Sequence, residues 1–184
     1  RCVAALTGDS TRVCVSAPPM TRPRLTVSLN APPDGRSHNV AVDQPSVAVI
    51  MRTRDRPAML DRAIQDVLAQ TSSDWQLVIV DDGGDTRTVE DVVERYRDDL
   101  GARLVLLHNP VSHGMEAATN FGLEASNSRL LAIHDDDDTW QPRFLQETSC
   151  YLRDHPDMDA VAVRTEVVRE RQVGEDFVEY ERTV

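Results

Sequence analysis

Residues 76–84 read Gln-Leu-Val-Ile-Val-Asp-Asp-Gly-Gly, an uninterrupted apolar run that ends in two carboxylates and two glycines. Such a run, rich in β-branched residues, is typical of a strand buried on both faces of a parallel sheet. A similar run occupies residues 46–51, and shorter ones occupy 104–107 and 130–133. The gaps between these runs have the length of a helix, so the pattern indicates an α/β domain around a mainly parallel sheet.

Helices are predicted between the strands from apolar residues at helical spacing and from signals at the helix ends. The first begins at Pro57, because proline is favoured at the first helical position. We expect the second to have Thr88 as its N-cap and to stop at Gly101. The other predicted elements are helices over about 115–125 and from Pro142, and hairpin strands over 160–170 and 177–184.

Composition excludes several classes of protein. The 184 residues carry 20 basic and 31 acidic side chains, and the net charge of −11 argues against general nucleic-acid binding. All the basic residues are Arg, which removes the Schiff-base and P-loop chemistries that need Lys. The apolar runs are too short to cross a bilayer. We therefore predict a cytoplasmic protein without a transmembrane segment or a nucleic-acid partner, either free or peripheral at the inner face of the membrane.

The chain divides at about residue 45. Residues 1–45 contain Pro-rich turn and linker chemistry without sustained periodicity, and we expect a low-complexity, disordered N-terminal tail. The strict alternation of elements belongs to residues 46–184. The last predicted strand runs to the end of the sequence with no helix to cover it, so we expect a fold that is truncated at its C-terminus.

Four consecutive carboxylates, Asp135 to Asp138, follow the fourth predicted strand. Ligands of parallel sheets bind at the carboxyl ends of the strands, and carboxylate oxygens suit Mg²⁺ or Mn²⁺. The alternative is a solvated turn that caps the next helix, for which one Asp is enough. The length of the run favours a metal site.

Two other strand ends contribute to the same edge of the sheet. Asp81 and Asp82 precede Gly83 and Gly84, where a carboxylate can accept a hydrogen bond from a ligand ring N–H. The first strand leads into residues 51–56, whose three guanidinium groups can neutralise phosphate or stack on a base. A solvated loop is the alternative for each of these Arg residues.

Taken together, these motifs resemble those of family-2 glycosyltransferases with the GT-A fold. The resemblance covers Ser46 to about Leu145, the nucleotide-diphospho-sugar-binding portion at the N-terminus of that family. It rests on the Arg-Asp-Arg-Pro loop, Val80-Asp81-Asp82-Gly83, the segment from Asn109 through Gly114 to Asn120, and the acidic run with Trp140 and Pro142. The best match to the family's D-x-D motif is Asp135-x-Asp137, followed by Asp138.

The resemblance implies roles for these residues. Asp82 would bind the uracil N–H of a UDP-sugar, and Thr53 and Arg54 would line the nucleotide pocket, with Arg54 standing where the family usually has an aromatic residue. Asp135 and Asp136 would contact the donor as well. The metal ligands would be Asp137, assisted by Asp135 and Asp138.

The implied activity is metal-assisted, inverting transfer of a sugar from a nucleotide-diphosphate donor to a hydroxyl of a glycan, lipid or small-molecule acceptor. The catalytic base is expected beyond Val184. A sugar or cofactor nucleotidyltransferase is an alternative, although the loop after the first strand has no Gly and the chain no Lys. A degenerate, non-catalytic nucleotide-binding domain is another, against which the intact acidic run speaks.

Overall fold

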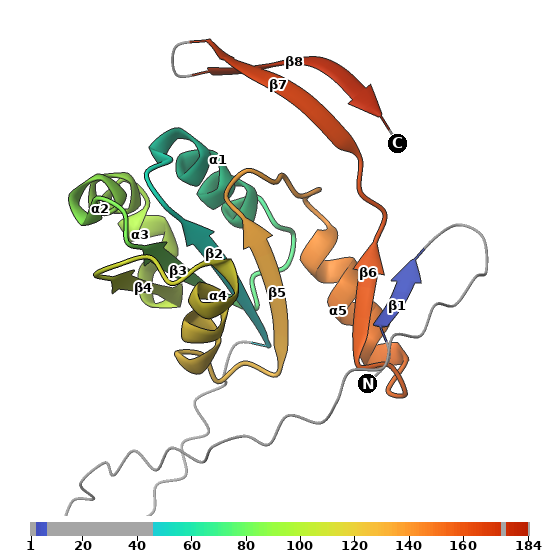
Figure 1. The fold of residues 1–184 in the computed structure, drawn as a ribbon. Helices are drawn as coiled ribbons and strands as arrows, with labels where there is room; N and C mark the ends of the chain where they lie inside the picture. Colours follow the sequence, from blue (N-terminus) through green and yellow to red (C-terminus); the bar gives the residue numbers. More distant parts are fainter. Residues whose placement is uncertain (1–2, 7–45, 174–175, 184) are drawn as a thin grey trace, which may run out of the picture.

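The computed structural model describes residues 3–6, 46–173 and 176–183, and it contains an α/β core as the sequence predicts (Figure 1). The strands are β1 (Val3–Leu6), β2 (Val47–Thr53), β3 (Trp75–Asp82), β4 (Leu104–Asn109), β5 (Leu130–Asp135), β6 (Ala160–Val163), β7 (Val167–Val173) and β8 (Asp176–Thr183). The helices are α1 (Pro57–Leu68), α2 (Thr86–Glu94), α3 (Arg97–Leu100), the 3₁₀ turn η1 (Gly101–Arg103), α4 (Met115–Glu124) and α5 (Phe144–Asp154).

The central sheet has four parallel strands in the order β4-β3-β2-β5. Strands β2 and β3 lie in the middle and are buried along nearly their whole length, which explains their unbroken apolar sequences. Two small sheets complete the described structure, a parallel pair of β1 with β6 and an antiparallel hairpin of β7 with β8. The predicted fold class is therefore confirmed.

Helices cover both faces of the central sheet. On one face, Leu60, Ile64 and Val67 of α1 pack with the apolar side chains of α2, α5 and the sheet in the larger core cluster. On the other face, Ala118 of α4 packs against a smaller cluster formed by β2 and β3. Successive residues of β2 and β3 belong alternately to the two clusters, as expected for strands that are covered on both faces.

Several element boundaries differ from the prediction. The second helix begins at Thr86 because Asp85 is its N-cap, with a side chain that accepts bonds from the Arg87 amide and from the Thr88 hydroxyl. Thr88 therefore assists the cap from inside the helix. The predicted helix is interrupted at Arg95 and Tyr96, and α3 then ends at Leu100, with Gly101 as its C-cap at the predicted stop. Helix α5 begins two residues after Pro142.

The ends of the chain are described only in part. The predicted tail over 1–45 contains β1, and the remainder of it lies outside the described residues. The predicted strand over 160–170 is two strands, because β6 ends at Val163 and β7 begins at Val167. No helix in the described ranges combines the length and the apolar character needed to cross a membrane.

Candidate functional site

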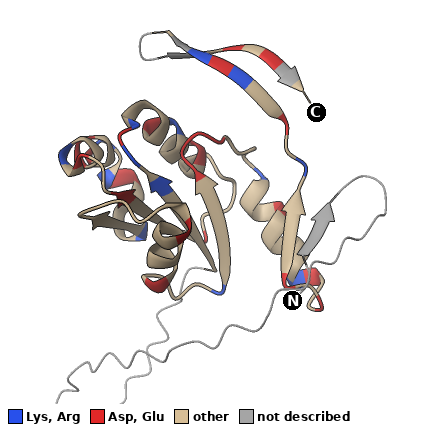
Figure 2. Ribbon diagram, in the orientation of Figure 1, with Lys and Arg blue, Asp and Glu red and all other residues tan. Residues whose placement is uncertain are grey.

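A cavity of about 330 Å³ lies at the carboxyl ends of β2, β3 and β5. Parallel strands bring their carboxyl ends to one edge, and Figure 2 shows basic and acidic segments together there, at the tip of β2 and in the loop after β5. The cavity is lined by Arg52, Thr53, Arg54, Arg56, Asp82, Ser112, Gly114, Met115, Ala118, Asp135 and Asp137. Charged groups of both signs therefore face the same space.

Two guanidinium groups, from β2 and from the loop after it, form ion pairs with three of the four carboxylates of the acidic loop. Arg52 forms an ion pair with Asp135, its neighbour in the register of β2 with β5. A second bond from Arg52 Nη1 reaches the carbonyl oxygen of Met115, at 3.1 Å. Arg56 contacts both Asp136, at 2.5 Å, and Asp137, at 3.1 Å. These ion pairs thus link the carboxyl end of β2 to the carboxyl end of β5.

The four carboxylates of the loop have different surroundings. Asp135 and Asp137 line the cavity, and the Asp137 side chain is 51% exposed. Asp136 is fully buried, and burial raises the pKa of its carboxyl group against the opposing effects of the Thr53 hydroxyl and the Arg56 guanidinium. Asp138 is exposed and does not line the cavity, and its amide donates to the Asp135 carbonyl oxygen at 3.0 Å.

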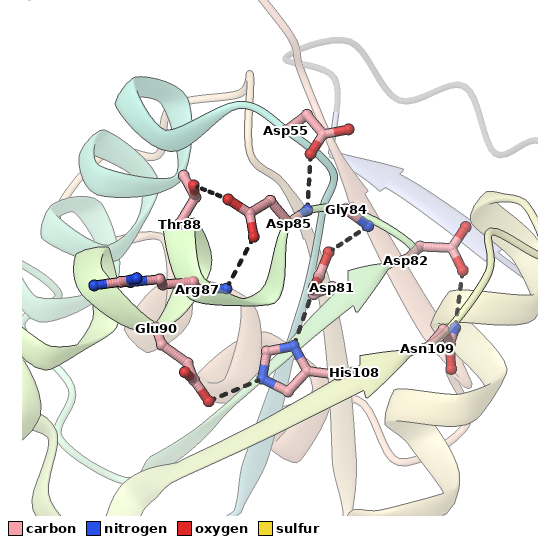
Figure 3. A network of polar contacts seen from close by, with 10 residues as sticks. All are labelled: Asp55, Asp81, Asp82, Gly84, Asp85, Arg87, Thr88, Glu90, His108 and Asn109. Atoms are coloured by element: carbon pink, nitrogen blue, oxygen red, sulfur yellow. Dashed lines mark hydrogen bonds and ion pairs between the residues drawn. The ribbon is translucent and has the colours of Figure 1, made fainter.

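Asp82 is nearly buried at the end of β3 and organises the loop after β4. Its carboxylate accepts from Asn109 Nδ2 at 2.8 Å (Figure 3). It also accepts from Ser112 Oγ at 2.7 Å. The amides of His113 and Gly114 donate to it at 3.0–3.2 Å. These four donors outweigh the cost of burial and lower the pKa of Asp82 to about 2. The carboxylate is therefore ionised and fully hydrogen-bonded.

Asp81, its neighbour, points to the opposite side of the strand and belongs to a separate network (Figure 3). It is fully buried, accepts from the Gly84 amide at 2.9 Å and contacts His108 Nδ1 at 3.0 Å. The Asp55 carboxylate accepts from the Asp85 amide at 2.9 Å. The Asp55 bond fastens the loop after β3 to the loop after β2, and the Asp81 contacts hold that loop and β4, so these residues are structural supports beside the cavity.

His134 lies beneath the acidic loop in an apolar setting. It is fully buried, its ring is 4.2 Å from that of Trp140, and Trp140 stacks on Phe144. Burial lowers the pKa of His134 to about 4. The ring is therefore neutral at physiological pH and serves as packing under the loop.

The other predicted nucleotide-contacting residues, Thr53 and Arg54, both line the cavity. Thr53 is buried, whereas the Arg54 side chain is 58% exposed and lies 3.9 Å from Asp55. Among the described residues, no three His, Cys, Asp or Glu side chains are grouped closely enough to hold an ion by themselves. The carboxylates of Asp135 and Asp137 both line the cavity. Two carboxylates fit a divalent cation that takes its remaining ligands from a phosphate-bearing molecule.

Sequence reasoning missed some of the residues that shape this cavity. The sequence marks Arg52 and Arg56 only as members of a basic loop, because their ion-pair partners lie about eighty residues away along the chain. The register of β2 with β5 is the signal that places Arg52 beside Asp135. Ser112 and Met115 carry no pattern that marks them, because they reach the cavity only through the fold of the loop after β4.

Comparison with solved structures defines the class of fold. A crystal structure of Staphylococcus aureus TarS in complex with UDP matches with a TM-score of 0.55 and 20% identity, covering 60% of this chain and 33% of that one. The mannosyltransferase PcManGT from Pyrobaculum calidifontis, in complex with GDP-Man and Mn²⁺, matches with a TM-score of 0.52, 21% identity and coverage of 60% and 33%. The fold is therefore similar to that of GT-A glycosyltransferases.

The sequence itself then gives the family. The family described as glycosyl transferase family 2 matches residues 48–176, and the chain belongs to that family. An uncharacterized glycosyltransferase from Nostoc sp. is 35% identical over 100 residues, covering 54% of this chain and 30% of the relative. A PGL/p-HBAD biosynthesis glycosyltransferase from Mycobacterium tuberculosis is 29% identical over 118 residues, covering 64% and 45%. The chain thus spans less than half the length of these relatives.

Proposed function

We propose that the cavity binds the nucleotide diphosphate of a sugar donor, with UDP-sugars as the first class to test, and that the whole protein transfers the sugar to an acceptor hydroxyl. The observation that carries the proposal is that Asp82, Asp135, Asp137 and three Arg residues line one cavity at the carboxyl edge of the sheet. Family membership supports the reaction class. The solved structures with UDP and with GDP-Man and Mn²⁺ support a nucleotide-sugar ligand.

The donor diphosphate is assigned to the side of the cavity where Arg52 and Arg56 meet the acidic loop. Guanidinium groups suit phosphate oxygens because they present paired N–H donors in a plane. Asp137 and Asp135 are proposed to hold Mg²⁺ or Mn²⁺ there, and the cation supplies charge stabilisation for the departing nucleoside diphosphate. Asp138 is exposed and does not line the cavity. Its proposed contribution to cation binding is therefore indirect, through a water molecule or through the backbone of the loop.

The nucleoside is assigned to the side formed by Thr53, Arg54 and Asp82. A carboxylate has about four acceptor positions, and protein groups already fill those of Asp82. A bond from a uracil N–H to Asp82 therefore requires a donor to leave, and Ser112 is the candidate because its hydroxyl can rotate. Asp136 is proposed to contribute to donor binding indirectly, because its buried carboxyl group holds the Arg56 side chain in place.

The later steps of the reaction are proposed by analogy with the family. An acceptor hydroxyl on a glycan, a lipid or a small molecule would attack the anomeric carbon with inversion of configuration. The base that removes its proton stays predicted beyond Val184. A cytoplasmic location, free or peripheral at the membrane, also stays a prediction.

The test is calorimetric titration of UDP, and separately of GDP, into the protein with and without Mn²⁺. We expect Mn²⁺ to tighten binding, and we expect Asp137→Ala to abolish that gain because Asp137 faces the cavity. Asp157→Ala, which changes an exposed carboxylate on the loop after α5, is the matched control and should behave as the wild type. UDP and GDP binding that is absent, or that ignores both Mn²⁺ and Asp137→Ala, would refute the proposal.

A further inference from the structure

A row of polar side chains on one side of α1 binds the main chain of the segment that follows β5. Arg62 and Asp66 lie four residues apart on α1, and Gln70 follows four residues later, just beyond the end of the helix. Residues at this spacing share one face of a helix. Each of the three bonds a different part of residues 137–145.

Arg62 makes the contact that lies nearest to the cavity. Its Nη2 donates to the carbonyl oxygen of Asp137 at 3.2 Å, and its side chain is only 21% exposed. This bond fixes the peptide group of Asp137 from the α1 side, while Arg56 holds the Asp137 carboxylate. The backbone and the side chain of one residue are thus held by two different guanidinium groups.

The remaining members of the row fix the segment further along. Asp66 Oδ2 accepts from the Trp140 amide at 3.1 Å. Gln70 is 8% exposed and bonds the segment twice, donating to the Gln141 carbonyl at 3.1 Å and accepting from the Leu145 amide at 3.0 Å. The path from the acidic loop to the start of α5 is therefore fastened to α1 at intervals.

Arg62 also reaches the β7–β8 hairpin. Its Nη1 lies 2.5 Å from Glu170 Oε2 on β7. Glu170 is paired in register with Glu179 on β8, and like charges placed opposite each other destabilise a hairpin. The guanidinium of Arg62 offsets that repulsion. One side chain consequently links the hairpin to the backbone of the acidic loop.

We propose that Arg62 is a positioning residue for Asp137: it holds the acidic loop at the place where Asp137 meets the donor and its cation, and it ties that place to the β7–β8 hairpin. The inference rests on the proposed function of the cavity. A side chain that supports a metal ligand without touching the metal typically changes metal affinity by about 10- to 100-fold. The effect of Arg62 should therefore be confined to the cation-dependent part of donor binding.

The experiment compares UDP titrations with and without Mn²⁺ for the wild type, Arg62→Met, Arg62→Lys and Glu170→Gln. Met keeps most of the length of the Arg stem and its packing but removes the donors. We expect Arg62→Met to weaken UDP binding about tenfold in the presence of Mn²⁺ and to leave metal-free UDP binding unchanged. Arg62→Lys should restore part of the loss, since an ammonium group can reach one of the two acceptors. Glu170→Gln should weaken UDP binding in the presence of Mn²⁺ by a smaller factor, because it removes the ion pair that holds Arg62 but leaves Arg62 itself in place.

Arg143→Met is the matched control, because Arg143 is an exposed Arg whose ion pair with Glu147 lies away from the cavity. It should match the wild type in both titrations. An equal loss with and without Mn²⁺ in Arg62→Met would show a general structural role and would overturn the proposal. Unchanged binding in Arg62→Met would overturn it as well.

Hydrogen exchange of the metal-free protein provides a second readout that needs no ligand. Loss of the Arg62 bond should speed amide exchange in residues 136–146 and leave β2 and β3 unchanged in Arg62→Met or, if that variant unfolds, in Arg62→Lys. Unchanged exchange in the loop would refute the positioning role. If the wild type binds UDP under neither condition, the function proposed for the cavity fails, whereas the exchange result still decides whether Arg62 fixes the loop.

Discussion

Replacing Gly83 by Ala should destabilise the protein strongly, because two separate costs meet at this position. Gly83 has φ +77°, in the left-handed region that L-residues rarely adopt. A Cβ there would lie 2.3 Å from the Ser112 amide nitrogen and 2.7 Å from the Val111 carbonyl carbon. Both are backbone atoms, so the clash is relieved only if the loop after β4 moves.

The magnitude follows from these two terms. The positive φ costs an Ala residue about 1–2 kcal/mol. Movement of the loop also weakens the bonds that Ser112, His113 and Gly114 donate to Asp82, each worth about 1 kcal/mol or more because the acceptor is charged. We therefore expect Gly83→Ala to lower the free energy of unfolding by about 3–5 kcal/mol.

Gly101→Ala is the matched control, since Gly101 also has a positive φ, +53°, but nothing lies within 4 Å of an added Cβ. This variant should lose only the conformational term, about 1–3 kcal/mol, because φ +53° with ψ −133° is a conformation that L-residues rarely adopt. Urea unfolding followed by circular dichroism measures both values. If Gly83→Ala is no more destabilised than Gly101→Ala, the close approach of the two loops does not constrain the fold, and the reasoning is refuted.

Two further predictions concern the core and its dependence on pH. Gly122→Ala should lower the free energy of unfolding by about 1–2 kcal/mol in the same urea assay, even though Ala favours helices. The added Cβ would lie 2.8 Å from Ile50 Cγ2 and 3.0 Å from Val80 Cγ2, in a core that has no room for it. A variant more stable than the wild type would contradict this prediction. His134 has its pKa lowered to about 4, so the unfolded state gains a proton before the folded state does as the pH falls below the ordinary value of 6.5. In EDTA-containing buffer, the free energy of unfolding of the wild type relative to that of His134→Asn should therefore fall by about 3 kcal/mol between pH 7 and pH 4. If urea titrations give the same difference at both pH values, His134 does not cause the loss of stability in acid.

The central sheet could be predicted from the sequence because buried parallel strands need unbroken apolar runs. Strands β2 and β3 have such runs, and their burial leaves little choice of structure. Helix boundaries depend on smaller differences. Asp85 and Thr88 are both good capping residues, but it is the Asp85 carboxylate that accepts from a first-turn amide, that of Arg87, and the Thr88 hydroxyl donates to the same carboxylate at 2.6 Å.

The sequence predicts that the candidate site residues gather at the carboxyl edge of the sheet, and the structure places most of them there, but their arrangement within the cavity could not be predicted. Four adjacent Asp residues look equivalent in a sequence. The turn after β5 directs Asp136 into the interior, Asp137 to the cavity and Asp138 to solvent. That difference depends on backbone geometry, which a run of identical residues does not encode by itself. The hydrogen bonds that fill the acceptor positions of the Asp82 carboxylate likewise come from a loop about thirty residues further along the chain.

The ion pairs of Arg52 and Arg56 with the acidic loop have a consequence for how a ligand enters. The chain itself supplies counter-charge to the carboxylates that would otherwise repel one another, so this edge of the sheet can fold without an external ion. A cation that binds Asp135 or Asp137 competes with a guanidinium group for the same carboxylate, and a guanidinium that is released can bind a second negative charge. If a cation and an anion occupy the cavity together, as proposed above, their binding would be an exchange of partners, in which each ligand frees a charged group that the other can bind.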